Sequence, residues 1–595
     1  MDRRTMIFST AAALANHPTR ILAQGNPGSK SLNELFDQFM KENLDLAPQW
    51  ATSLGLDGGE RARQKSELDD SSEAGIARQK SLTASQLSRL AAFDRTSLGP
   101  VDAVNYDVVM FVLRAEAKAN SAFSYGTGGV GAPYVLSQGD GNYQYIPSFL
   151  DSSHTISTQA DCDAYLARLG GFAASMDQEI EVARHDMALG VVPPDFSLAK
   201  TLLQMQKLRA PAPEASSLTQ SLVRRAREHN ISGDYARLAA QLVGDQVYPA
   251  LDRQIALVRE MQKIATQDAG VWRLPAGRDY YEASLLHYAT TSKDPAELHQ
   301  RGLQLVREYT ARADEIMRRQ GLTRGTVGER TRALYKDPKY LYPDSDAGRE
   351  MLLSDLNRRV QSVWGKLPTY FGALPKAKLE IRRAPPEREA GSVIGYYSAG
   401  SLDGTRPGIY WINLRDTGES PKWFLPTVTY HEGIPGHHVQ LSIQRELDLP
   451  LIRKATSFSA YSEGWALYAE QLAFEMGEYD SDPIGHYGQL HAALVRSARV
   501  VIDTGLHSMK WTRERAIHYF SDLLGEPEAN ATTEVERYCV WPGQACSYML
   551  GKLKFLELRD RSQKSRGARF DIRKFHDAVL LPGAVPLEIL DKFSV

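Results

Sequence analysis

The sequence predicts a mainly α-helical, large two-lobed fold with one small β element. From Ser31 to about Leu379, apolar residues recur at helical spacing, as in SLNELFDQFMKENLDL and PAELHQRGLQLVREYTARADEIMRRQG. Between Ala384 and Pro426 the pattern changes to two short β-branched and aromatic runs, SVIGYYSAG and GIYWINL, separated by the turn-rich SLDGTRP. A chain of 595 residues is long enough to form such a two-lobed unit with a sizeable core.

Composition excludes several classes of function. The net charge is −2, and the basic residues are spread along the chain, so we expect no nucleic-acid surface and no polybasic membrane patch. No run approaches 18 consecutive apolar residues, so we expect no membrane-spanning helix. The chain has 3 cysteines, which excludes a disulfide framework and a multi-cysteine zinc site. We interpret them as buried or spectator thiols.

The first 25 residues, MDRRTMIFSTAAALANHPTRILAQG, resemble a bacterial twin-arginine export signal. They combine an arginine pair, a short apolar stretch and small residues near the end, although NHPTR interrupts the apolar stretch. We therefore expect a periplasmic or secreted protein, with a cytoplasmic one as the alternative. After this segment we predict a helical N-terminal lobe over residues 26–385 and a second lobe over residues 386–595, which contains the metal motif described below.

Local signals place the first helices, and helical patterns return after the β element. Ser31 is a candidate helix cap with Glu34 three residues on, Asp294-Pro295 begins a helix, and Gly321 ends it. The glycine-rich SYGTGGVGAPYVLSQGDGNY lacks the spacing of a phosphate-binding loop, so we interpret it as an ordinary loop. Helices follow in PTVTYHEG, HHVQLSIQREL, YSEGWALYAEQLAFEMG, HAALVRSARVVIDTGLHSMK and CSYMLGKLKFLELRDRSQ.

The stretch TYHEGIPGHHVQ has the opening of a zinc-peptidase helix but an altered spacing. In the standard motif, two histidines four residues apart share a helix face, and the Glu after the first histidine is the general base. His431 and Glu432 fit this opening, but Pro435 occupies the next expected position, and the following histidines are His437 and His438. On an unbroken helix the sixth position points away, and the seventh lies ~10.5 Å along the axis, too far for two Zn–N bonds of ~2.0–2.1 Å.

The Pro-Gly pair makes this longer spacing usable. Pro435 removes a backbone donor and clashes with the preceding turn, while Gly436 carries no steric constraint. We therefore expect the helix to kink or bulge here and to return a later histidine, His437 or His438, to the metal bound by His431.

A nearby helix should supply the third ligand. YSEGWALYAE offers Glu463 and Glu470, seven residues apart and so on one face. Glu463 is the better candidate because the small residues Ser462 and Gly464 on either side permit close packing. The sequence thus predicts one catalytic Zn2+ per chain, held by His431, one of the two later histidines and Glu463.

Three segments carry a resemblance to known proteins. HEGIPGHH, SEGWALYAEQ and WPGQACSYMLGKLKFLELR resemble segments of the bacterial domain of unknown function 885 family, which is grouped with the HExxH-type metallopeptidases. More distantly, the chain is similar to Taq-type carboxypeptidase, thimet oligopeptidase and angiotensin-converting enzyme. The resemblance therefore implies a helical metallopeptidase-like fold with a deep cleft.

The more distant relatives also bear on the choice of ligands. Their second zinc histidine commonly follows a glycine, which implies His437, after Gly436, with His438 as the alternative. Their third ligand is a Glu further along the chain. Glu463, 26 residues beyond His437 and 25 beyond His438, matches that arrangement for either histidine.

Other residues are candidates for supporting roles. YMLGKL is similar to a C-terminal stretch of the Taq-type enzymes, which implies Tyr548 as the donor to the oxyanion, with a core tyrosine as the alternative. Asp503 lies four residues before His507 on one helix face and could orient His431 through a hydrogen bond. The β element could bind extended substrate by strand addition, with a purely structural hairpin as the alternative. The candidates for substrate binding are Tyr397, Tyr410, Arg537, Tyr538 and His507, with Arg499 as a further one. For each of them, a structural role is the alternative.

These features favour a zinc-dependent peptidase acting on short peptides. Glu432 would take a proton from the attacking water and pass it to the leaving amine. A metal-dependent hydrolase of an ester or non-peptide amide is one alternative, and a non-catalytic peptide-binding protein is another. Glu432 argues against the last, because a structural metal needs ligands but no base.

Overall fold

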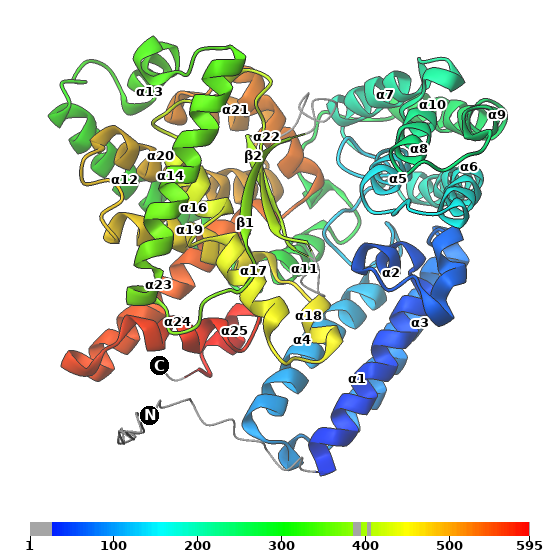
Figure 1. Ribbon diagram of the computed structural model, residues 1–595, viewed down its shortest axis with the longest axis horizontal. Coiled ribbons are helices and arrows are strands. Elements are labelled where there is room, and N and C mark those ends of the chain that lie inside the picture. Colours follow the sequence, from blue (N-terminus) through cyan, green and yellow to red (C-terminus); the bar gives the residue numbers. More distant parts are fainter. Residues whose placement is uncertain (1–26, 385–393, 401–405, 594–595) are drawn as a thin grey trace, which may run out of the picture.

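The computed structural model describes residues 27–384, 394–400 and 406–593, so the predicted export signal lies outside the described residues. The fold is mainly α-helical with one small three-stranded sheet, as predicted (Figure 1). Helices α1 to α4 form one group with its own core, and α5 to α10 form a second group beside it. The remaining helices and the sheet form the largest part, which contains the His-Glu motif.

The N-terminal helices follow the predicted periodicity. Helix α1 begins four residues before the expected cap Ser31, which therefore lies inside the helix. The first group comprises α1 (Pro27–Leu46), α2 (Pro48–Leu54), α3 (Glu73–Ala91) and α4 (Pro100–Ala122). The second comprises α5 (Asn142–Ser152), α6 (Gln159–Ala188), α7 (Asp195–Arg209), α8 (Ser217–Glu228), α9 (Tyr235–Leu242) and α10 (Tyr248–Gln262).

The largest part is built on two long helix pairs. Helix α12 packs along α20, and α19 packs along α23. Asp294 caps α12 by accepting the Ala296 N–H at 2.8 Å, as the sequence predicts. The helices are α11 (Gly277–Ala289), α12 (Pro295–Arg319), α13 (Val327–Lys336), α14 (Asp346–Tyr370), α16 (Leu425–Glu432), α17 (His437–Glu446), α18 (Leu451–Ala455), α19 (Ser459–Glu475), α20 (Pro483–His507), α21 (Arg513–Leu524), α22 (Glu528–Val540), α23 (Ser547–Arg566), α24 (Ile572–Leu580) and α25 (Leu587–Leu590).

The sheet has the order β1-β3-β2. Strands β2 (Gly395–Ser398) and β3 (Gly408–Ile412) are antiparallel and confirm the predicted β element. Strand β1 (Leu379–Arg383), which the sequence did not reveal, pairs with β3 in parallel. The lobe boundary predicted at residues 385/386 thus separates β1 from the other two strands of the same sheet. Helices on the two sides of this boundary also pack together, α12 on α20 and α14 on α16.

Two expectations from composition can be compared with the structure. All three cysteines are free and buried, as predicted. Among the residues that the structure describes, no helix has the length and apolarity needed to cross a membrane.

A glycine-to-glycine contact brings α19 and α23 together. A Cβ built on Gly464 would lie 2.4 Å from the Gly551 Cα, and one built on Gly551 would lie 1.9 Å from the Ala460 carbonyl oxygen. No side chain fits between these backbones, so the helices touch directly. Glu463 adjoins Gly464, and Tyr548 lies about one turn before Gly551, so this contact brings the two residues into the same part of the molecule.

We predict that Gly551→Ala lowers the free energy of unfolding by at least about 1–3 kcal/mol, because the added methyl group forces α19 and α23 apart. The matched control is Gly365→Ala on α14, where an added Cβ meets no atom within 4 Å. That change should raise stability by up to about 1 kcal/mol, since alanine favours helices over glycine. Midpoints of urea unfolding measure both effects, and equal midpoints for the two variants would contradict direct backbone contact.

Candidate metal centre

The motif folds as two helices joined by a tight corner. Helix α16 ends at Glu432 and α17 begins at His437, with a cis Ile434–Pro435 bond between them. The predicted interruption at the Pro-Gly pair is therefore present, and it is a full break. A Cβ on Gly436 would lie 1.9 Å from the His431 carbonyl oxygen. Only glycine lets the chain fold back so closely, and this return brings His437 next to His431.

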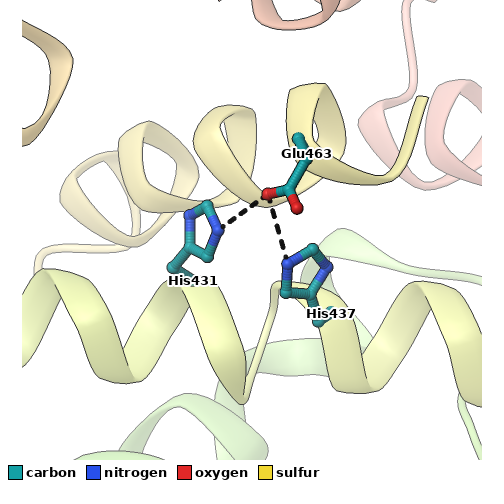
Figure 2. A group of neighbouring side chains, drawn as sticks. All are labelled: His431, His437 and Glu463. Atoms are coloured by element: carbon teal, nitrogen blue, oxygen red, sulfur yellow. Dashed lines mark hydrogen bonds and ion pairs between the residues drawn. The ribbon is translucent and has the colours of Figure 1, made fainter. Parts of the chain in front are cut away.

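His431, His437 and Glu463 converge on one point (Figure 2). The Nε2 atoms of the two histidines lie 3.3 and 3.5 Å from the same oxygen, Oε2 of Glu463. The imidazole rings are 4.8 Å apart and nearly perpendicular, at 88°. One potential ligand atom from each of the three residues lies within 4.8 Å of the other two, so the break in the helix produces the cluster that an unbroken helix could not.

His438 points away from this cluster. Its Nδ1 lies 3.0 Å from the Tyr397 hydroxyl, and its Nε2 lies 3.1 Å from the Ala377 carbonyl oxygen. Burial lowers the pKa of His438 to about 4, so the ring is neutral. Both ring nitrogens thus have partners elsewhere, and the structure places His437 beside His431 and Glu463. The predicted substrate-binding residue Tyr397 instead contacts His438.

Glu470 orients His431. The Nδ1 of His431 donates to Glu470 Oε1 at 2.8 Å, and Glu470 Oε2 accepts the Thr427 hydroxyl at 2.8 Å. This corrects the suggestion that Asp503 plays this role. Asp503 is fully buried and accepts hydrogen bonds from Tyr281 and from the Gly543 amide.

The charges around the cluster reinforce each other. Burial opposes protonation of His431, but hydrogen bonds to Glu463 and Glu470 outweigh it and raise its pKa to about 9. Burial alone would raise the pKa of Glu463, but His437 and His431 hold it well below its usual range. Burial raises the pKa of Glu432, with the two histidines opposing the shift. The imidazoles of His431 and His437 therefore lie among three carboxylates, those of Glu432, Glu463 and Glu470. This surplus of negative charge favours binding of a cation.

Tyr548 flanks the cluster. Its ring lies 6.5 Å from the His431 ring, at an angle of 24°. The Arg499 guanidinium lies 4.8 Å from the Tyr548 ring centre, and that of Arg496 lies 5.9 Å from it. Arg496 also acts electrostatically on Glu432, and its buried Nε has no hydrogen-bond partner. Sequence reasoning missed Arg496, although its position three residues before Arg499 places both on one helix face.

Three of the predicted substrate-binding residues are buried in the structure. The ring nitrogens of His507 bind the Val271 amide and the Tyr538 carbonyl, at 3.1 and 3.0 Å. Tyr410 is fully buried between the sheet and the neighbouring helices, where its hydroxyl has no hydrogen-bond partner among the described residues and interacts electrostatically with Glu432. Tyr538 is also fully buried, and its hydroxyl donates to Glu534. Contrary to prediction, these side chains present no surface to a substrate.

Two adjoining cavities lie between the N-terminal helices and α11. They have volumes of about 530 and 610 Å³, and both are lined by α3, α4 and α11. The larger reaches Ser457 and Phe458, which directly precede α19, the helix that carries Glu463. Glu116 lines both cavities, and burial raises its pKa to about 7. Neither cavity is lined by His431, Glu432, His437 or Glu463.

The donor set fits a catalytic zinc ion. Such sites use three protein ligands from histidine nitrogens and carboxylate oxygens, and leave a further position open. A carboxylate that holds the other nitrogen of a ligand histidine is a regular companion of these sites. The three protein ligands would be His431, His437 and Glu463. Glu470 is the carboxylate that holds the other ring nitrogen of His431.

Comparison with known proteins identifies the family. A model described as "Bacterial protein of unknown function (DUF885)" matches residues 48–593. No curated protein matches the chain. Two solved structures are similar. A putative lipoprotein from Colwellia psychrerythraea is 33% identical, with 96% of this chain and 99% of that chain covered and a TM-score of 0.90. A putative lipoprotein of unknown function from Shewanella oneidensis is 18% identical, with 94% and 99% covered and a TM-score of 0.71.

The family match extends over nearly the whole chain, and the Colwellia structure shares both the fold and a third of the sequence. The chain therefore belongs to the DUF885 family of bacterial proteins.

Proposed function

We propose that this protein is an exported, zinc-dependent peptidase that hydrolyses short peptides. One observation carries the proposal: His431, His437 and Glu463 converge within 4.8 Å, and Glu432 directly follows the first of them. Ligands alone would suffice for a structural metal, whereas a carboxylate beside them suits a reaction that moves a proton. Zinc held there would act as a Lewis acid toward a carbonyl oxygen and toward water.

Glu432 would act as the general base. It ends α16 at the corner, and its carboxylate interacts electrostatically with both His431 and His437. It would accept a proton from the attacking water and deliver it to the leaving nitrogen, while the hydroxyl joins the carbonyl carbon and the C–N bond breaks. The side chain is half-buried, so it is screened from bulk solvent but still accessible.

Tyr548 and Arg496 would stabilise negative charge on the carbonyl oxygen. The Tyr548 ring lies beside His431, and Arg496 lies over that ring. A phenol hydroxyl and a guanidinium are both donors that a developing oxyanion can use. Because Arg496 also acts on Glu432 and Glu470, its charge would offset part of the negative charge of these carboxylates.

The burial of the cluster and the relatives support the substrate class and the location. The side chains of His431 and His437 are only 5% and 11% exposed, so the site suits short peptides better than folded proteins. Both similar solved structures are described as putative lipoproteins. Together with the twin-arginine N-terminus, that description supports export.

We predict that His437→Gln abolishes tight zinc binding, whereas His438→Gln retains about one zinc per chain. The first change removes a ligand nitrogen, and the second alters a ring whose nitrogens bind Tyr397 and Ala377. Zinc titration of chelator-treated protein measures both, with thermal unfolding as the check on folding. The opposite pattern would identify His438 as the ligand.

We predict that Glu432→Gln retains zinc but lowers the rate of peptide hydrolysis by about 10²–10⁴-fold, because the glutamine amide cannot accept the proton. A mixed peptide library followed by mass spectrometry measures cleavage. The matched control is Glu557→Gln on α23, whose side chain is 60% exposed and lies outside the cluster. Full activity of Glu432→Gln with zinc bound would contradict the mechanism.

We predict that Glu470→Gln weakens zinc affinity by about 10–100-fold, because His431 loses the carboxylate that fixes its ring. The matched control is Asp503→Asn, another buried carboxylate on a neighbouring helix, which should leave zinc affinity unchanged. Competition with a chromogenic chelator gives both affinities. If Asp503→Asn weakened binding and Glu470→Gln did not, the assignment of Glu470 would be wrong.

A further inference from the structure

A cluster of positive charge lies beside Tyr548, with the Arg499 guanidinium 4.8 Å from the Tyr548 ring centre. One oxygen, Oε2 of Glu534, accepts hydrogen bonds from Arg499 at 2.8 Å, from Arg537 at 3.1 Å and from the Tyr538 hydroxyl at 2.6 Å. Burial alone would raise the pKa of Glu534, but the two arginines hold it well below its usual range. The cluster therefore contains two cations and one anion, with a net charge of +1.

The guanidiniums of Arg499 and Arg537 have more N–H donors than their hydrogen bonds to Glu534 use. Each carries five N–H groups. Beyond Glu534, Arg499 Nε donates to the Tyr538 hydroxyl at 3.0 Å, and Arg537 Nη1 donates to Gln544 at 2.6 Å. The remaining nitrogen atoms of Arg499 and Arg537 are not among the buried atoms of the described residues that lack a hydrogen-bond partner. The side chains are 12% and 24% exposed, so their remaining donors face accessible space.

The cluster is held rigidly. Gln544, which fixes Arg537, lies in the corner between α22 and α23, and Asp503 holds that corner by accepting the Gly543 amide at 3.0 and 3.1 Å. Arg499 is held by Glu534 and by Tyr538. Such pre-organised, planar guanidinium pairs are the protein groups best suited to a carboxylate, which they bind through parallel hydrogen bonds.

The distance to the metal ligands fits the end of a peptide chain. The Tyr548 ring lies 6.5 Å from the His431 ring, and the Arg499 guanidinium lies 4.8 Å from the Tyr548 ring. Arg499 is thus at most about 11 Å from the His431 ring, and an extended chain spans roughly 3.3–3.6 Å per residue. A carboxylate at Arg499 would be one to three residues from a bond cleaved at His431.

We propose that Arg499 and Arg537 bind the free C-terminal carboxylate of the substrate, so that the protein releases one to three residues from the C-terminus of short peptides. This inference rests on the proposed function. In the reaction, the hydroxyl of water joins the carbonyl carbon of the upstream fragment, the C–N bond breaks, and the amine of the released fragment takes the proton. Glu534 and Tyr538 are positioning residues for the arginines.

The first test compares matched peptides that end in a free acid or in an amide, using the zinc-loaded protein. We expect kcat/KM to be about 10–100-fold higher for the acid, because a charge-assisted hydrogen bond is lost in the amide. Arg499→Met and Arg537→Met should each reduce this preference toward unity, mainly through KM. Arg537→Lys should retain part of it, and Arg515→Met on α21, which lies over Trp511, should leave it unchanged.

The second test measures binding alone and separates the two proposals. Calorimetry with zinc-loaded Glu432→Gln compares the same acid and amide peptides. Acid-selective binding without any hydrolysis by the wild type would preserve the carboxylate site and overturn the peptidase proposal. Hydrolysis with equal rates for acid and amide would overturn the carboxylate site alone. The wild-type comparison needs no arginine variant, so a folding defect in Arg499→Met cannot obscure the result.

Discussion

The site depends on one close approach of backbone to backbone, at Gly436. The chain folds back so tightly that a Cβ there would lie 1.9 Å from the His431 carbonyl oxygen. This return places His437 beside His431, and every other feature of the centre is arranged around that pair. With a larger residue at Gly436, the corner would have to open and the two histidines would separate.

Helix α19 completes the arrangement from the opposite side. Glu463 supplies the oxygen that faces both histidines, and Glu470, two turns on, fixes the ring of His431. Between them, the Trp465 indole donates to the Pro435 carbonyl at 3.1 Å, so the same helix also ties down the corner. Its contact with α23 through Gly464 and Gly551 then brings Tyr548 to the cluster. A single helix thus links the ligands, their support and the neighbouring tyrosine.

The sequence allowed much of this to be predicted, for physical reasons. Helical periodicity and turn residues reveal local structure, so the mainly α fold and the β2-β3 pair were predictable. The break at Pro435-Gly436 follows from the steric properties of those two residues. Strand β1 was missed because LEIRR lacks a clear strand pattern, and its pairing with β3 is a contact between distant segments. The buried positions of Tyr410 and His507, and the choice of Glu470 over Asp503, also depend on tertiary packing, which periodicity does not report. Arg496 was overlooked because a single arginine in a helix is usually a surface charge.

The most direct test of the metal centre is a crystal structure of the zinc-loaded protein with anomalous diffraction measured at the zinc absorption edge. We expect one strong anomalous peak within bonding distance, ~2.0–2.2 Å, of the Nε2 atoms of His431 and His437 and of a Glu463 carboxylate oxygen. A peak bonded to His438, or zinc bound only at sites away from these residues, would contradict the central claim.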